Sequence, residues 1–230
     1  MTGPGTPAAD GGWDPDDTLR RALWIGGGQW AGKSTVARLL AVRHGVTAYH
    51  YDYHDARGHN DRRIADRVAR GAPAADPDPE AVWVRPTPEE MAAATLAGFP
   101  QRFAWALDDL RALVSGHPVI AEGWGLRPEL VAPLIDSPRR MVVMVPAPEF
   151  RRHQVDALPR AAALGNGVSD PERAQANRLA RDRIVAEDAV RAARRLGIRV
   201  IEVDGSRGAD AIAEDVADHF GPYLPRRYGA

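Results

Sequence analysis

The 230-residue sequence has no cysteine, no excess of either charge and no apolar run long enough to span a membrane. Without cysteine the chain can form no disulfide, no thiolate nucleophile and no cysteine-based zinc site, which is compatible with a reducing cytosol. Lys plus Arg number 30 and Asp plus Glu number 31, so the net charge gives no reason to expect DNA or RNA as a partner. The first residues also lack the charged-then-apolar layout of a signal peptide. We therefore expect a cytoplasmic protein with neither a membrane nor a nucleic-acid partner; no feature indicates its oligomeric state.

The length suits a single α/β domain that carries insertions. Residues 1–17 are mainly Pro, Gly, Ala and Asp, a composition that predicts a flexible tail. Residues 18–230 would form the domain, with a helical, acceptor-side insertion at about 56–116 and a lid at about 151–183.

A glycine-rich loop stands between an apolar run and a helical pattern. It fits G-x-x-x-x-G-K-[ST], follows residues 22–25, and precedes a helix that ends at Gly45, where a left-handed cap belongs. Loop amides and a helix N-terminus in this order form a site for polyphosphate. Lys33 would bridge the β- and γ-phosphates of ATP, and the Ser34 hydroxyl would bind Mg²⁺. The predicted nucleotide-binding residues of the loop are Gly27, Gly28, Gln29, Trp30, Ala31, Gly32, Lys33, Ser34 and Thr35.

Apolar and β-branched runs predict five strands, and helical patterns between them favour a parallel sheet. The strands are expected at residues 19–25, 46–55, 118–125, 141–145 and 198–203.

Two acids are expected where the second and third strands end. Ligands of open α/β sheets bind beyond the carboxyl ends of strands, so both acids could reach the γ-phosphate region. Asp52 is the candidate that orients or deprotonates an acceptor hydroxyl, or else it caps the next turn. Glu122 is the candidate that supports Mg²⁺, or else it caps the following helix.

Three histidines, His50, His54 and His59, follow one another closely in the second of these segments. Two histidines four apart on a strand do not converge, and no carboxylate or cysteine pattern completes a frame around them. The sequence therefore does not favour a metal site there.

Arginines gather on the segment that follows the fourth strand. Arginines on a mobile segment can spread the charge of a phosphoryl-transfer transition state, and Arg178 and Arg181 are the catalytic candidates. As solvated helix residues they would have no such role.

From about residue 19 to residue 224 the chain resembles the P-loop kinases of the nucleoside/nucleotide kinase-like group. The resemblance implies the three-layer sandwich of P-loop NTPases, with a five-stranded parallel sheet of order 2-3-1-4-5 and a lid. Glu122-Gly123-Trp124 is similar to the acid-Gly-aromatic exit of strand three in adenylate kinases. Asp52 is similar in place to the strand-two acid of shikimate and gluconate kinases and of antibiotic phosphotransferases. Arg151 is similar in placement to the group's lid arginines, and the loop that ends at Arg207 is similar to the one that touches adenine.

The chain departs from two patterns. Adenylate kinases have Pro-Arg directly after the aromatic residue, where this chain has Gly125-Leu126-Arg127, and no Asn-Lys-x-Asp guanine signature follows a later strand. The sequence therefore predicts an ATP- and Mg²⁺-dependent phosphotransferase that acts on a hydroxyl of a small metabolite, nucleoside-like molecule or antibiotic. A nucleoside monophosphate kinase and a non-catalytic ATP-binding regulatory module are the alternatives.

Overall fold

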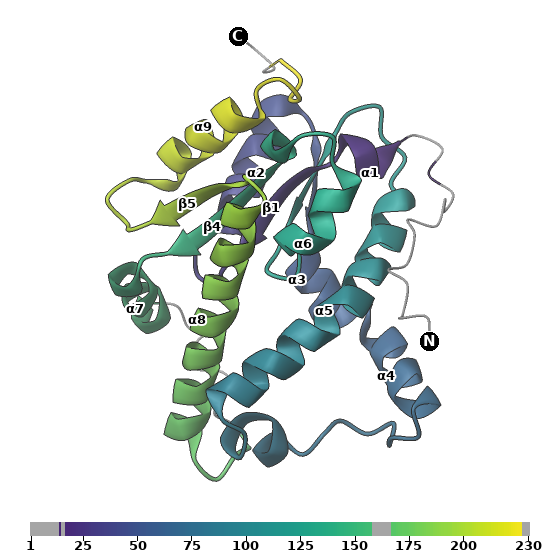
Figure 1. Ribbon diagram of the computed structural model, residues 1–230, viewed down its shortest axis with the longest axis vertical. Helices are drawn as coiled ribbons and strands as arrows, with labels where there is room; N and C mark the ends of the chain where they lie inside the picture. The colour runs from purple at the N-terminus through teal and green to yellow at the C-terminus, as the bar shows by residue number, and fades with distance from the viewer. Residues whose placement is uncertain (1–13, 15–16, 158–166, 227–230) are drawn as a thin grey trace.

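The computed structural model describes residues 14, 17–157 and 167–226. Its centre is one five-stranded sheet in which all neighbours are parallel and the order is β2-β3-β1-β4-β5 (Figure 1). The predicted α/β class and strand order are confirmed. The strands are β1 Leu23–Gly27, β2 Thr47–His50, β3 Val119–Glu122, β4 Met141–Pro146 and β5 Arg199–Val203.

Helices cover both faces of the sheet, an arrangement that fits a three-layer sandwich. On one face lie α2 (Lys33–His44) and α9 (Ala209–Phe220); on the other lie α5 (Pro88–Arg111) and α8 (Pro171–Arg195) (Figure 1). Neighbouring β1 residues alternate between the two cores: Trp24 packs on the α5 side, whereas Leu23 and Ile25 pack on the α2 side. The central strand is apolar throughout because both its faces are buried.

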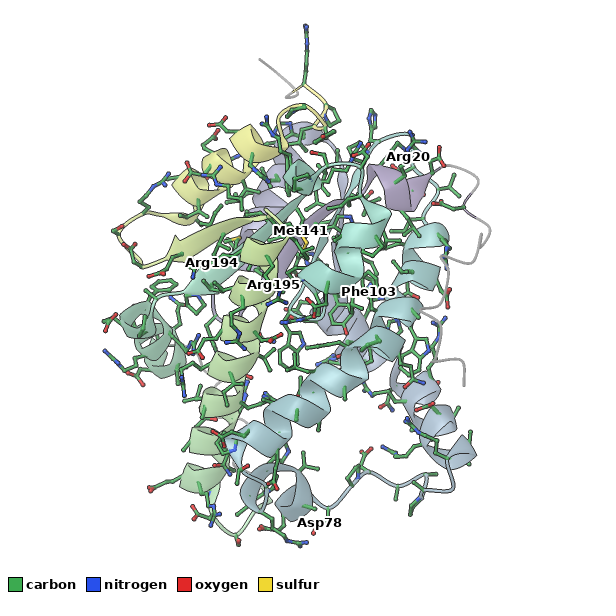
Figure 2. All side chains as sticks on the ribbon, in the orientation of Figure 1. Arg20, Asp78, Phe103, Met141, Arg194 and Arg195 are labelled. Carbon is green, nitrogen blue, oxygen red and sulfur yellow. The ribbon has the colours of Figure 1, made fainter. Side chains whose placement is uncertain are left out.

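The two cores hold most of the large buried apolar side chains. Figure 2 shows Phe103 and Met141 inside the molecule, whereas Arg20 and Asp78 lie at its edge.

Shorter helices occupy the connections. The predicted insertion at 56–116 contains two of them and also α5, which is the crossover helix between β2 and β3. A capping box starts α5: the Thr87 hydroxyl accepts from Glu90 N, and the Glu90 carboxylate accepts from Thr87 N. The remaining helices are α1 Thr18–Arg21, α3 Tyr51–Tyr53, η1 His54–Gly58, α4 Asn60–Ala69, η2 Glu80–Val84, α6 Pro128–Val131, η3 Ala132–Leu134, η4 Pro138–Arg140 and α7 Pro148–Ala157.

The first strand begins later than predicted. Residues 18–21 form the helical turn α1, because the Asp14 carboxylate accepts hydrogen bonds from Thr18 N at 2.8 Å and Leu19 N at 3.1 Å. The Thr18 hydroxyl then donates to Leu113 O, which ties this turn to the end of α5.

The second strand ends earlier than predicted. It stops at His50, and the chain continues as α3 and then η1, so Asp52 lies on a helical turn just beyond the strand. His54 begins η1 and His59 directly follows it, so neither histidine lies on a strand. The prediction against a metal site assumed strand geometry, and that assumption is wrong.

Two predicted segments fall largely outside the described residues. Of the tail at 1–17, only Asp14 and Asp17 are described, and residues 158–166 of the expected lid are not. In the part of the chain that the structure describes, no helix has both the length and the apolar character needed to cross a membrane.

Candidate functional site

The glycine loop between β1 and α2 is fitted tightly against β4. Gly28 N donates to Met144 O at 2.9 Å, and Gly27 has a φ of 116°. A Cβ at Gly27 would lie 2.1 Å from Met144 O, so only glycine can stand there. The loop therefore has a fixed path into the N-terminus of α2.

Trp30 is the unusual residue of this loop. Its φ is 70°, a conformation that costs a non-glycine residue roughly 1–3 kcal/mol, and its side chain is only 5% exposed. The Arg178 guanidinium lies 5.6 Å from the centre of its ring, within the range of a cation–π contact. Trp30 therefore forms a contact between the loop and α8.

Lys33 is the only lysine of the sequence, and its side chain is 5% exposed. Nζ donates to Gly28 O at 2.6 Å, so the amine is held by the loop that it follows. A small, mostly polar pocket of about 80 Å³ opens here. Gln29, Trp30, Gly32, Lys33, Ser34, Thr35 and Asp52 line it.

Asp52 reaches this pocket from α3. Its Oδ1 accepts from the backbone N–H of Trp124 at 3.1 Å, which fixes the carboxylate. Burial raises the pKa of Asp52 to about 6; the positive charge of Lys33 opposes this shift, and the negative charge of Glu122 adds to it. Lys33 and a carboxyl group with a raised pKa therefore line the same pocket.

Gly123 explains how Asp52 comes so close to the exit of β3. Its φ is 154°, and a Cβ there would lie 2.6 Å from Tyr51 Cβ and 2.9 Å from Asp52 Oδ1. The glycine after Glu122 therefore lets α3 pack directly on the backbone of the neighbouring connection.

Glu122 ends β3 with its side chain fully buried. Its Oε1 lies 2.8 Å from His50 Nδ1, whereas Oε2 has no hydrogen-bond partner among the described residues. A carboxylate oxygen without a partner is the type of ligand that Mg²⁺ prefers. Ser34 lines the small polar pocket and Glu122 does not, so the fit to the predicted ion rests on the chemistry of the two side chains.

A second pocket, of about 190 Å³, lies near the first. Gly32 and Thr35 line both, so both border the N-terminus of α2. Arg207 belongs to the second pocket and is fixed by an ion pair with Asp215 and a hydrogen bond to Ala211 O. The lining of this pocket is Ala31, Gly32, Thr35, Val36, Phe150, Gln154, Val203, Arg207, Ala209 and Ile212.

A larger pocket, of about 500 Å³, lies between η2, α5 and α8. Arg181 stands at its edge, with its guanidinium 5.5 Å from the centre of the Trp83 ring and 5.1 Å from that of Trp124. Trp124 thus contacts one lining residue of each pocket, Arg181 through its ring and Asp52 through its N–H. Ala81, Val82, Trp83, Pro86, Glu90, Met91, Ala94, Thr95 and Arg181 line it.

Arg151 lies apart from the other predicted site residues. With Arg183 it lines a separate hollow of about 410 Å³ between α7, α8 and the end of β4, and none of the three pockets above includes it. Burial lowers the pKa of Arg151, and Asp182 and Glu187 counteract this shift.

Sequence reasoning missed three features of the site. His50 was not assigned as the partner of Glu122, although a buried acid at the end of a strand needs one. The contact of Asp52 with the Trp124 amide and the pocket walls from Phe150 and Gln154 depend on tertiary packing, and no sequence signal marks them.

No protein-family model matches the chain, and no curated protein matches it.

Proposed function

We propose that the chain is a P-loop kinase, an ATP- and Mg²⁺-dependent phosphotransferase that moves the γ-phosphoryl group to a hydroxyl of a small molecule. The observation that carries this proposal is the small polar pocket in which Lys33, Ser34 and Asp52 line one space. A cation, a hydroxyl and a carboxyl group at the N-terminus of a helix are the groups that phosphoryl transfer requires.

ATP would occupy the two pockets that Gly32 and Thr35 both line. Its phosphates suit the smaller, polar pocket, where Lys33 and the N–H groups at the start of α2 supply positive charge. Its base suits the second pocket, which offers an aromatic wall from Phe150 and polar groups from Gln154 and Arg207. Lys33 would exchange its hydrogen bond to Gly28 O for one to a phosphate oxygen.

Ser34 and Glu122 would hold Mg²⁺, directly or through water. When bound, the ion would neutralise part of the phosphate charge. His50, at 2.8 Å from Glu122 Oε1, would orient the carboxylate so that its unpaired oxygen stays turned to the ion.

Asp52 would accept the proton of the attacking hydroxyl. General bases act best when their pKa lies near the working pH, and the pKa of Asp52, raised by burial to about 6, meets that condition. The hydrogen bond from the Trp124 N–H fixes the carboxylate, so it would stay directed at the attacking hydroxyl during the transfer.

Arg178 and Arg181 would face the transferred group from α8. Arg178 lies against Trp30 of the loop, and Arg181 lies against Trp124 next to Asp52. Both positions suit guanidinium groups that spread negative charge in the transition state.

The acceptor would bind in the pocket of about 500 Å³, which has mainly apolar and aromatic walls with Arg181 at its edge. Walls of this kind suit a hydroxyl compound of mixed polarity as the acceptor. A nucleoside monophosphate would instead need arginines from the insertion, of which Arg85 and Arg102 are ion-paired with Asp78 and Asp55.

The test is phosphoryl transfer to a mixed panel of nucleosides, nucleoside monophosphates, sugars, hydroxy acids and antibiotics, followed by mass spectrometry. Lys33→Ala should lower kcat by on the order of 10²–10³, as loss of one preorganised charge-stabilising donor does. Arg38→Ala, an exposed change on the same helix, is the matched control. An unchanged rate in the Lys33 variant would refute the kinase.

Amine labelling separates binding from transfer. Because Lys33 is the only lysine, an amine-reactive reagent can modify only Lys33 and the N-terminal amine. ATP should protect Lys33 and leave the N-terminus unprotected. Protection without any phosphorylated product in the panel would support the non-catalytic ATP-binding module instead.

A further inference from the structure

Two histidines and an aspartate converge just after the turn that carries Asp52. They are His54, the first residue of η1, His59, the residue directly after η1, and Asp109 on α5. One ligand atom from each lies within 4.8 Å of the other two, and no second cluster of this kind occurs among the described residues. Nothing in the proposed phosphotransfer uses these three side chains.

A rare backbone turn brings the two histidines together. His59 N donates to His54 O at 2.8 Å, the i→i+5 bond of a π-helix. In an α-helix, residues five apart point about 140° away from each other, since each residue turns the helix by about 100°. The wider turn places both imidazoles on the side of α5. Such turns are energetically unfavourable and occur frequently at functional sites.

The ring contacts fix the imidazoles in ligand-like positions. His54 stacks on Tyr49 with 4.4 Å between ring centres, and His59 packs edge-on against Trp105 at 5.8 Å. His54 Nδ1 lies 3.3 Å from Asp109 Oδ2, and His59 Nε2 lies 2.7 Å from the same oxygen. Both nitrogens therefore already point at one carboxylate.

Burial and access suit a bound ion. His59 is 2% exposed, and its Nδ1 has no hydrogen-bond partner in the described part of the chain. The His54 side chain is 45% exposed, so the cluster opens to solvent on that side. A path for entry and room for a water ligand are both features of metal sites with three protein ligands.

We propose that His54, His59 and Asp109 bind a divalent transition-metal ion of the Zn²⁺ type. Imidazole nitrogens with one carboxylate oxygen match Zn²⁺ and its neighbours in the first transition row, whereas Mg²⁺ prefers oxygen ligands alone. Bonds of about 2.0–2.2 Å would set the three ligand atoms roughly 3.5 Å from each other. The two histidine nitrogens, now 3.3 and 2.7 Å from Asp109 Oδ2, would therefore move slightly away from that oxygen to admit the ion. The Tyr49 hydroxyl, which donates to Asp109 Oδ2 at 2.8 Å, would orient the ligating carboxylate.

The ion would fasten the segment after β2 to α5. Asp52 lies two residues before His54, so this link would fix the backbone from which the candidate base projects. Because the ion binds the folded state, it would also raise the stability of the protein with metal concentration.

The experiment is a titration of the untagged, metal-stripped full chain with Zn²⁺, and with Co²⁺ as a visible-absorption probe. We expect one equivalent of either metal to bind, with the absorption of a low-coordinate Co²⁺ site and a rise in Tm. Asp109→Asn and His54→Ala should each weaken binding at least tenfold. Tyr49→Phe should weaken it by about 10–100-fold, as loss of an outer partner does. His54 is half-exposed, so its variant keeps a folded protein in the test.

Two controls decide the result. His117→Ala removes an exposed histidine outside the cluster and should leave affinity unchanged. Lys33→Ala should also leave Zn²⁺ binding unchanged, so a failure of the phosphotransfer proposal and a failure of this one remain distinguishable. The proposed site is wrong if the wild-type protein binds no metal ion, or if binding persists in Asp109→Asn and His54→Ala. The cluster would then be only a hydrogen-bonded contact.

Discussion

His50 Nδ1 lies 2.8 Å from Glu122 Oε1, and the two residues are also register partners on β2 and β3. Glu122 is fully buried, and its other oxygen has no hydrogen-bond partner among the described residues. His50 is thus the side chain that satisfies one oxygen of a fully buried acid at the end of β3.

Removing that partner should therefore destabilise the fold. His50→Ala is expected to lower the free energy of unfolding by about 1–3 kcal/mol, the cost of leaving a buried polar group unsatisfied. His50→Asn can still offer an N–H near the position of Nδ1 and should recover part of the loss. Urea unfolding of the three proteins measures the difference, and equal losses in both variants would contradict the role of the hydrogen bond.

Asp52 should make the stability of the protein depend on pH. Its pKa rises from 3.8 to about 6 on folding because burial disfavours the charged form. A raised folded-state pKa stabilises the fold at pH values below the unfolded pKa, and this contribution is lost as the pH rises through the folded pKa. As the pH rises from about 4 to 7, ionisation of Asp52 should thus lower the free energy of unfolding by on the order of 2–3 kcal/mol.

Asp52→Asn removes that cost while keeping an oxygen for the Trp124 N–H. The variant should gain stability over wild type as the pH rises from 4 to 7, and it should lose acceptor-dependent phosphotransfer. Wild-type activity should rise through a limb near pH 6 in kcat/KM. A stability difference that does not change with pH would show that Asp52 is not held in this environment.

Gly123 should tolerate no side chain. Alanine there would place Cβ 2.6 Å from Tyr51 Cβ and 2.9 Å from Asp52 Oδ1, on a backbone with a φ of 154°. Gly123→Ala is therefore expected to cost about 1–3 kcal/mol and to displace Asp52 from the pocket. Gly116→Ala is the matched control, because nothing lies within 4 Å of a Cβ there and it should be neutral or slightly stabilising. Thermal unfolding of both variants tests the contrast.

The elements that follow from local pattern were predictable. The glycine loop and α2 with its cap at Gly45 follow from spacing and from the placement of glycines, whereas the strand order was implied by the resemblance to P-loop kinases. Asp52 and Lys33 were expected at one site because parallel strands present their carboxyl ends at the same edge. The pocket that they both line agrees with that expectation.

The rest depends on contacts between distant residues. The run after Ala48 reads as a strand by composition, yet it turns helical at Tyr51, where packing against Gly123 and Gly125 decides the backbone path. That change also produces the π turn that unites His54 with His59, which no spacing rule for strands or α-helices could reveal. Arg151 and Arg178 look alike in sequence, but Arg178 contacts Trp30 of the loop, whereas Arg151 lines a separate hollow.

Arg181 should affect the binding of the acceptor, and Arg207 should affect the binding of ATP. Arg181 lines the pocket assigned to the acceptor, and Arg207 lines the pocket assigned to the base of ATP. Arg181→Lys keeps the charge and can still pair with the buried Asp182, but it loses the planar contact with Trp83 and Trp124. We expect kcat/KM for the acceptor to fall roughly tenfold, equivalent to about 1.4 kcal/mol, with KM for ATP unchanged.

Arg207→Ala should show the opposite pattern, with a higher KM for ATP and an unchanged KM for the acceptor. Steady-state kinetics with each substrate varied in turn measures both variants against wild type. The two patterns together test which pocket binds ATP and which binds the acceptor. If the assignment were reversed, the Arg181 variant would raise KM for ATP and the Arg207 variant would affect the acceptor. If both variants raised the KM for ATP alone, the pocket between η2, α5 and α8 would not be the acceptor site, and the acceptor would have to approach Asp52 from another side.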